Sequence, residues 1–473
     1  MLFYTLQFAV FILFTLCVYW SLPSDRWRHP FLFACSLFFY AWWDWRLVGL
    51  LLAVIVVSYI GALAIARAQA RGGSGKAWLT AACGVNLGLL AAFKYANFFA
   101  GSLKAALEPL GIHPGWTTLH IILPVGISFY VFQSLTYLIN VHRAKLEADR
   151  NFVKIALYIS FFPHLVAGPI IHATDFLWQL KTTRSYDQEM FLEGAKKFVL
   201  GFFMKSVFAD NIALFVDPVY AHIGRFDNLS VLLATFGFYA QIYFDFAGYS
   251  LMAIGITNTL GYWLPDNFNF PCRAVSIIDF WRRWHISLST WLRDYLYIPL
   301  GGNRGSRLFQ YRNLMITMLL GGLWHGASWN FVLWGGVHGF ALCAAHAWRT
   351  WRGTVQRAAW LAALALIGSW AATQIFVLLC WIPFRSANFA QTLEILRAIC
   401  WLRPAAALEA APIPWMLLFV PILADTFILS SARLKRRVEF ANPWLACAII
   451  GAAFLVALLF MFVGNKPFIY FQF

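Results

Sequence analysis

The chain has 473 residues, of which 61% are hydrophobic and only 12% are charged, whereas soluble proteins carry about a quarter charged residues. A soluble globule of this size cannot hide so apolar a composition, because its accessible surface still grows with mass. These values exclude an ordinary soluble protein and predict that lipid surrounds most of the chain. The 46 Phe, 23 Trp and 18 Tyr agree with this, since aromatic rings gather at membrane–water interfaces.

The formal net charge of +16 raises the question of nucleic acid. The Lys and Arg residues, however, lie mostly in short loops between apolar runs, where positive charge marks the cytoplasmic side of a membrane protein. We therefore expect a lipid bilayer and no nucleic acid as a partner. The eight Cys form no CxxC pair and no Cys/His cluster with zinc spacing, so we expect no metal site.

Apolar runs long enough to cross a bilayer recur along the whole chain, and their lengths predict about eleven true spans. The segment 272–300 is too charged to face lipid but is rich in Trp, Leu and Ile, so we expect a re-entrant or interfacial helix buried within protein. The sequence thus predicts one all-α membrane domain over residues 1–473. Its apolar runs lie at 2–20, 31–43, 47–66, 77–98, 118–140, 152–171, 192–216, 230–260, 312–346, 359–382, 413–430 and 443–464.

Basic loops orient these spans, since loops rich in Lys and Arg stay in the cytoplasm. The strongest basic cluster is 433–437, and only the run 443–464 follows it. The tail 465–473 is therefore predicted to face outward.

Ionisable groups inside a membrane are functional candidates, because a charged one costs about 2.5–3.5 kcal/mol at a helix centre. A segment read as a helix from Asp279 gathers Asp279, Arg282, Arg283 and His285 within two turns. Guanidinium groups suit bidentate phosphate binding, so Arg282 and Arg283 are candidates for holding the phosphates of coenzyme A. A cytoplasmic anchor of basic and Trp side chains is an equal alternative for the two arginines.

The glycine-rich run after residue 320 contains Leu323-Trp-His-Gly326, which we expect to place His325 in the middle of an apolar helix. An uncharged His there can take a proton from an attacking hydroxyl, and such base catalysis gives about 10²–10⁴-fold. A hydrogen-bonded His that joins two helices is the alternative, and it is the expectation for His338. Because His285 is a second polar site, we give a catalytic role of His325 the same weight as a structural hydrogen bond between helices.

For His164 and for the tail with Tyr470, a structural role is the first expectation. His164 lies beside Pro163, where a helix break would expose it, and we expect a structural role. The tail carries Tyr470 among aromatic residues, which is typical of an interfacial anchor. A Tyr hydroxyl that inserts into a polar core beside a base is instead a candidate nucleophile.

Several segments together resemble the membrane-bound O-acyltransferase (MBOAT) family, in particular its bacterial branch of alginate O-acetyltransferases and teichoic acid D-alanyl transfer proteins. The resemblance covers nearly the whole chain. It implies a ring of helices around a central tunnel, with a catalytic core at 118–346. The segments that carry it are Pro124–Gln133, Phe161–Pro169, Phe280–Arg304, Leu323–Gly326 and the tail 465–473.

The resemblance also implies roles for individual residues. His325 matches the active-site histidine, and His285 matches a second Asn-or-His position near the centre of the tunnel. Tyr470 would take the acyl group first, with His325 as its base. The donor implied by the resemblance is acetyl-CoA; Arg282, Arg283 and Trp324 are the candidates that the residues themselves offer for binding it, and no permanently bound cofactor is expected.

The same resemblance implies a multi-pass protein of the bacterial inner membrane with a periplasmic tail. The expected partners are a periplasmic esterase-like (SGNH) O-acetylation protein and an exported polysaccharide such as alginate or cellulose. Two non-catalytic alternatives remain, namely a transporter of acyl groups or polysaccharide precursors and a scaffold for periplasmic acetylation enzymes.

Overall fold

The computed structural model describes residues 1–473 except 116–122, 353–358, 403–408, 430–442, 462–468 and 470–473. The regular elements among the described residues are all helical, apart from an isolated bridge between Phe226 and Glu409. The chain divides into two compact units, and two of the three boundaries fall inside the helices α10 and α12, while the third lies between residues 265 and 266. Unit 1 comprises residues 1–198 and 252–265, and unit 2 comprises residues 199–251 and 266–473. The expectation of one domain stays a prediction.

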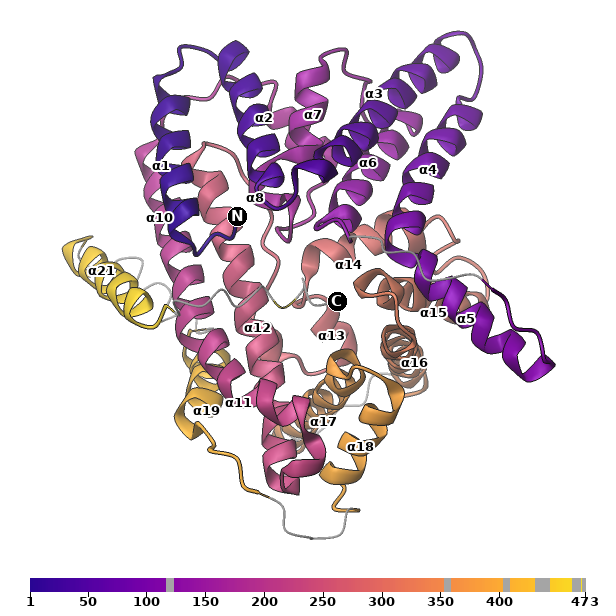
Figure 1. The fold of residues 1–473 in the computed structure, drawn as a ribbon, viewed down its shortest axis with the longest axis vertical. Helices are drawn as coiled ribbons and strands as arrows, with labels where there is room; N and C mark the ends of the chain where they lie inside the picture. Colours follow the sequence, from indigo (N-terminus) through magenta and orange to yellow (C-terminus); the bar gives the residue numbers. More distant parts are fainter. Residues whose placement is uncertain (116–122, 353–358, 403–408, 430–442, 462–468, 470–473) are drawn as a thin grey trace. The chain divides into compact units, whose positions relative to one another are not determined.

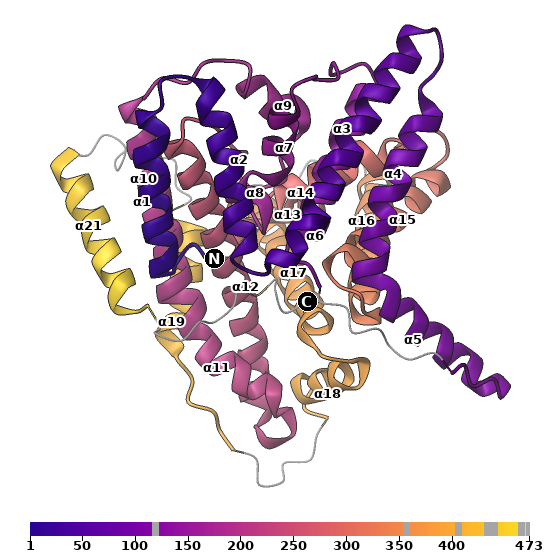
Figure 2. The ribbon, with the colours of Figure 1, turned by 45° about the horizontal axis from the view of Figure 1, so that its top comes forward.

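Unit 1 is built from antiparallel helix pairs, of which α3 and α4 lie side by side in both views (Figures 1 and 2). The turn between them needs left-handed backbone at Gly72 and Gly75, which glycine adopts without strain. Its helices, with η1 and η3 as 3₁₀ and η2 as π segments, are α1 Leu6–Ser21, α2 Asp25–Ala41, η1 Trp45–Leu47, α3 Val48–Ala70, α4 Lys76–Leu90, η2 Ala91–Tyr95, α5 Ala96–Leu107, η3 Glu108–Leu110, α6 Ile127–His142, α7 Phe152–Ser160, α8 Phe162–Leu165, α9 Ala173–Gln179 and the first part of α10 Gln188–Phe203.

The expected break near residue 163 is present, but it does not expose His164. The chain turns between α7 and α8, and the imidazole of His164 is fully buried against the side-chain amide of Gln133. The expectation of exposure was wrong because the short α8 packs inward and keeps the ring within unit 1.

Unit 2 contains both histidines of the predicted active site. Its elements, with η5 and η6 as 3₁₀ and η4, η7 and η8 as π segments, are η4 Met204–Ala209, α11 Asp210–Ala221, η5 Ile223–Arg225, most of α12 Asn228–Thr259, η6 Pro271–Arg273, α13 Ile277–Trp281, α14 Ile286–Leu292, η7 Arg293–Tyr297, α15 Arg307–His325, α16 Trp329–Arg352, α17 Ala359–Arg385, α18 Phe389–Ile399, α19 Trp415–Leu423, η8 Ala424–Leu429 and α21 Pro443–Leu459.

The run 312–346, expected as one span, is two helices. α15 ends at His325, the chain becomes extended at Gly326, and α16 begins three residues later. Glycines let the two helices cross closely, since a Cβ at Gly322 would lie 2.2 Å from the carbonyl oxygen of Phe331. A Cβ at Gly335 would come equally near the carbonyl oxygen of Met318, at 2.2 Å. Continuous hydropathy had concealed this sharp reversal.

Six helical stretches of the described chain are long and apolar enough to cross a membrane. This confirms an all-α, polytopic membrane protein, while the count of about eleven spans by length stays a prediction. Several expected runs form helices too short for the same criterion, such as α1 and α7. The six stretches are Trp45–Ala70, Lys76–Leu110, Gln188–Ala221, Asn228–Thr259, Trp329–Trp351 and Trp360–Arg385.

Each of the π segments described here carries at least one charged residue. Lys94 lies in η2, Lys205 in η4, Arg293 with Asp294 in η7, and Asp425 in η8. π turns inside α-helices are rare and often mark functional sites. The π turns among the described residues therefore coincide with charged residues.

Candidate functional site

His285 lies at a turn between two short helices of unit 2. α13 ends at Trp281, and α14 begins at Ile286. His285 itself has φ +43°, in the left-handed region that non-glycine residues seldom adopt. The expectation of a continuous helix through His285 was therefore wrong, because this turn interrupts it. The left-handed φ of His285 is a local backbone strain of a kind often found at functional sites. His285 is also completely buried.

The ring of His285 is held by Asn267, eighteen residues earlier in the chain. Nδ1 of His285 lies 3.0 Å from Oδ1 of Asn267, which also accepts the backbone N–H of Ser287 at 3.3 Å. A backbone N–H can only donate, so this contact identifies the amide oxygen of Asn267. The amide nitrogen of Asn267 in turn donates to Oγ of Ser250, at 3.1 Å.

The network leaves one nitrogen of His285 available. Because Oδ1 of Asn267 is an acceptor, Nδ1 of a neutral His285 must carry the proton. Nε2 then holds a lone pair, and this buried atom has no hydrogen-bond partner among the described residues. A buried polar atom without a partner in a protein interior calls for an explanation, and a catalytic role is one such explanation.

His325 lies at the C-terminal end of α15, and not in the middle of a helix as expected. Its side chain is buried but keeps a small exposed fraction of 5%. The following residue must be small, since a Cβ at Gly326 would lie 2.1 Å from the ring of Phe331. The close crossing of α15 and α16 therefore determines the position of His325.

The structure brings the two predicted histidines together within unit 2. The ring centres of His285 and His325 are 6.4 Å apart. The indole of Trp324 lies beside both, at 5.9 Å from His285 and 5.0 Å from His325. Aromatic edges enclose the pair, with Phe246 at 4.7 Å from His285 and Trp334 at 5.0 Å from His325. Two buried imidazoles thus lie in one aromatic enclosure of unit 2.

The two predicted arginines occupy different settings. Arg282 is exposed, which leaves its guanidinium open to a ligand from solvent. Arg283 is half-buried and already engaged, with Nε 2.9 Å from Oδ1 of Asp279 and Nη1 3.2 Å from the carbonyl oxygen of Asn269. Arg282 is therefore the more accessible of the two guanidinium groups, whereas Arg283 has a local structural contact.

The remaining candidates divide between buried and undescribed positions. His338 is buried, and its ring centre lies 4.6 Å from that of Trp334, but neither ring nitrogen has a hydrogen-bond partner among the described residues, so the expected hydrogen bond between helices is not found there. Tyr470 lies outside the described residues. Its neighbour Ile469 is described, is only 2% exposed, and donates its backbone N–H to Oδ2 of Asp245 at 2.8 Å.

Asp245 belongs to a buried ion cluster that sequence reasoning missed. Nζ of Lys205 lies 2.5 Å from Oδ1 of Asp210 and 2.9 Å from Oδ1 of Asp245. All three side chains are at most 10% exposed. A signal for this cluster was present, because Lys205 and Asp245 are charged residues inside predicted apolar spans. Asn267, in contrast, gave no periodic or motif signal.

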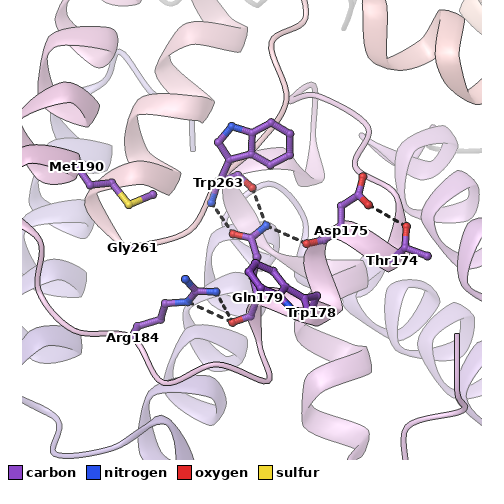
Figure 3. A pocket seen from close by; sticks show the side chains of 8 residues that line it. All are labelled: Thr174, Asp175, Trp178, Gln179, Arg184, Met190, Gly261 and Trp263. Carbon is purple, nitrogen blue, oxygen red and sulfur yellow. Dashed lines mark hydrogen bonds between the residues drawn. The ribbon is translucent and has the colours of Figure 1, made fainter.

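Unit 1 contains a separate pocket of about 420 Å³ that includes none of the predicted residues (Figure 3). The side chain of Gln179 ties its wall together, since Nε2 donates to the carbonyl oxygens of Asp175 and Trp263. Oε1 of Gln179 accepts the N–H of Trp263, at 2.7 Å. The lining residues are Thr174, Asp175, Trp178, Gln179, Arg184, Met190, Gly261 and Trp263.

Comparisons with known proteins bear on the same region. The sequence model of the membrane-bound O-acyltransferase family matches residues 145–382, which include both His285 and His325. A probable alginate O-acetylase of Azotobacter vinelandii is 43% identical over 381 residues, covering 80% of this chain and 74% of the relative. A peptidoglycan O-acetyltransferase of Helicobacter pylori is 36% identical, covering 77% of this chain and 72% of the relative.

A more distant relative is the teichoic acid D-alanyltransferase of Bacillus subtilis, which is 26% identical over 54% of this chain and 69% of its own length. The family match covers about half the chain, and the two O-acetyl-transferring relatives extend the likeness to more than three quarters of it. Together with the buried histidine pair and the six membrane-crossing stretches of the described residues, these matches show that the chain belongs to the membrane-bound O-acyltransferase family.

Proposed function

We propose that this membrane O-acyltransferase takes an acetyl group from cytosolic acetyl-CoA and passes it toward an exported polysaccharide, with His325 as the general base. The observation that carries the proposal is the buried pair of His325 and His285, whose ring centres are 6.4 Å apart. The O-acetyl-transferring relatives support acetyl as the group transferred.

The chemistry requires one base and one route for the proton. The oxygen of an attacking hydroxyl forms a bond to the thioester carbonyl carbon while His325 takes the hydroxyl proton. The carbon–sulfur bond then breaks, and the proton returns from His325 to the leaving thiolate, so that free CoA is released.

The bond to Asn267 limits what His285 can do. A neutral His285 that donates from Nδ1 has only a lone pair at Nε2, so it cannot donate a hydrogen bond to a thioester carbonyl. This favours a role in accepting a hydrogen bond or a proton, which orients the reacting group, over polarisation of the carbonyl. Asn267 is then a positioning residue that fixes the tautomer and the plane of the ring.

We assign donor binding to Arg282, Arg283 and Trp324. The exposed guanidinium of Arg282 is suited to the phosphates of coenzyme A, and Trp324 lies beside both imidazoles. The ion pair with Asp279 holds the side chain of Arg283, the next residue in the chain after Arg282. No permanently bound cofactor is required, because the donor supplies the activated acyl group.

The proposal for how the acetyl group reaches its acceptor is based on the tail 465–473 and on the names of the relatives. We propose that Tyr470 receives the acetyl group as a relay and that the tail 465–473 faces the periplasm of a bacterial inner membrane. An esterase-like periplasmic partner then moves the group to the polymer. Alginate is supported by the name of several relatives, and cellulose remains an alternative acceptor of the same chemical class.

The test is release of free CoA by the purified, detergent-solubilised full-length chain supplied with acetyl-CoA and the periplasmic partner. His325→Ala is expected to slow release by at least about 10²-fold. His222→Ala, an exposed His at the end of α11, serves as the matched control and should retain wild-type activity. Wild-type activity of a folded His325→Ala protein would reject the mechanism, and a wild-type chain that releases no CoA would favour a transporter or scaffold.

A further inference from the structure

The buried ion cluster of unit 2 forms its contacts through an unusual helical turn. Lys205 and Asp210 are five residues apart, a spacing that points to different faces of an α-helix. Here the chain runs through the π segment η4, and the backbone N–H of Asp210 donates to the carbonyl oxygen of Lys205. The π turn pairs residues i and i+5, so it brings the ammonium and the carboxylate together.

The same ammonium reaches across to α12. Nζ of Lys205 lies 2.9 Å from Oδ1 of Asp245, so one buried cation faces two buried carboxylates. The cluster as a group carries an excess negative charge if both carboxylates are ionised. Buried carboxylates need hydrogen-bond donors in addition to a counter-charge, because desolvation is otherwise expensive.

The C-terminal tail supplies such a donor. The backbone N–H of Ile469 donates to Oδ2 of Asp245 at 2.8 Å, while Oδ1 of the same carboxylate faces Lys205. Hydrogen bonds to charged groups are stronger than neutral ones. Ile469 is 2% exposed and belongs to the same hydrophobic cluster as Trp334 and Phe384, two of the rings that pack on His325.

We infer that Lys205, Asp210 and Asp245 form a tail clasp, in which Asp245 is a positioning residue that holds the chain at Ile469. The clasp acts on the residue directly before Tyr470, so its role in transfer rests on the proposed acyl relay. α12 also carries Phe246 against His285 and Ser250 against Asn267. One helix thereby organises both the histidine network and the anchored tail.

The clasp is tested by amide hydrogen exchange of the C-terminal peptide in the full-length, detergent-solubilised protein. Asp245→Ala removes the acceptor, and Ile469→Pro removes the donor while leaving the ion cluster intact. Each is expected to speed exchange of the peptide's remaining amides by about ten- to a hundredfold, the loss of one charge-assisted hydrogen bond. Thr235→Ala, ten residues earlier on α12, is the matched control and should leave tail exchange unchanged.

Wild-type exchange in folded Asp245→Ala and Ile469→Pro proteins would overturn the clasp. If Asp245→Ala does not fold, Ile469→Pro alone decides the question, since the clasp residues themselves are unchanged. CoA release is measured in parallel, and the relay predicts a lower kcat with an unchanged KM for acetyl-CoA. Faster tail exchange with unaltered kcat would retain the clasp and reject the relay, so the two proposals fail separately.

Discussion

The imidazole of His285 donates through Nδ1 to Oδ1 of Asn267 across 3.0 Å, and this bond sets which nitrogen can meet a substrate. Asn267→Leu removes the acceptor and frees the ring to adopt the other tautomer. We expect kcat to fall by about tenfold or more, because one orienting hydrogen bond is worth about 1–1.5 kcal/mol. Steady-state CoA release measures the change, and Ser250→Ala, which loses only the second partner of Asn267, should have a smaller effect.

A substitution at Gly326 tests the helix reversal that positions His325. Gly326→Ala would place a methyl group 2.1 Å from the ring of Phe331, so the chain must shift. Overpacking of this kind destabilises by about 1–3 kcal/mol, which should lower both the thermal midpoint in detergent and the rate of CoA release. Combining it with Phe331→Ala should restore part of the rate.

The control for that experiment is Gly368→Ala on α17, where an added Cβ would meet no atom within 4 Å. It should leave both the thermal midpoint and the activity close to wild type. An equal loss at the two glycines would show that the effect comes from helix flexibility and not from the crowded reversal.

The two arginines are expected to separate by kinetics. Arg282→Ala removes an exposed cation and should raise KM for acetyl-CoA by about tenfold, the loss of one charge-assisted contact. Arg283→Ala breaks the pair with Asp279 and should mainly lower thermal stability. Initial rates over a range of acetyl-CoA concentrations distinguish these outcomes, and an unchanged KM in Arg282→Ala would remove it from the donor site.

The ion cluster predicts an asymmetry between single and paired substitutions. Lys205→Met alone leaves two buried carboxylates without their cation and should destabilise the protein by about 3–5 kcal/mol. The double variant with Asp210→Asn removes one of those charges and should recover part of the loss. Thermal unfolding in detergent gives the comparison, and a double variant less stable than Lys205→Met would contradict the assigned charge balance.

The sequence predicted the class of this protein well, because hydropathy and charge report directly on lipid burial. Runs such as 47–66 and 359–382 correspond to long apolar helices of the structure, Trp45–Ala70 and Trp360–Arg385. Hydropathy could not show the reversal at Gly326, because the apolar run 312–346 continues through it. Glycine is also frequent within membrane helices. A glycine in the sequence therefore does not by itself predict a helix break.

The site was predicted in part. Composition and motif placed His285 and His325 in polar positions, and the structure brings them to 6.4 Å. The sequence did not reveal Asn267 or the left-handed turn at His285, since both depend on contacts between distant segments. The pairing of Lys205 with Asp210 was hidden for another reason, because their spacing fits a π turn and not the regular helix that periodicity assumes.

The central claim is that His325 and His285 act as a unit in acetyl transfer, and a double-mutant cycle on CoA release tests it most directly. Groups that work together give strongly non-additive losses. The account predicts that His325→Ala with His285→Ala is about as slow as the slower single variant. Losses that simply add between the two positions, or a folded double variant with wild-type CoA release, would contradict it.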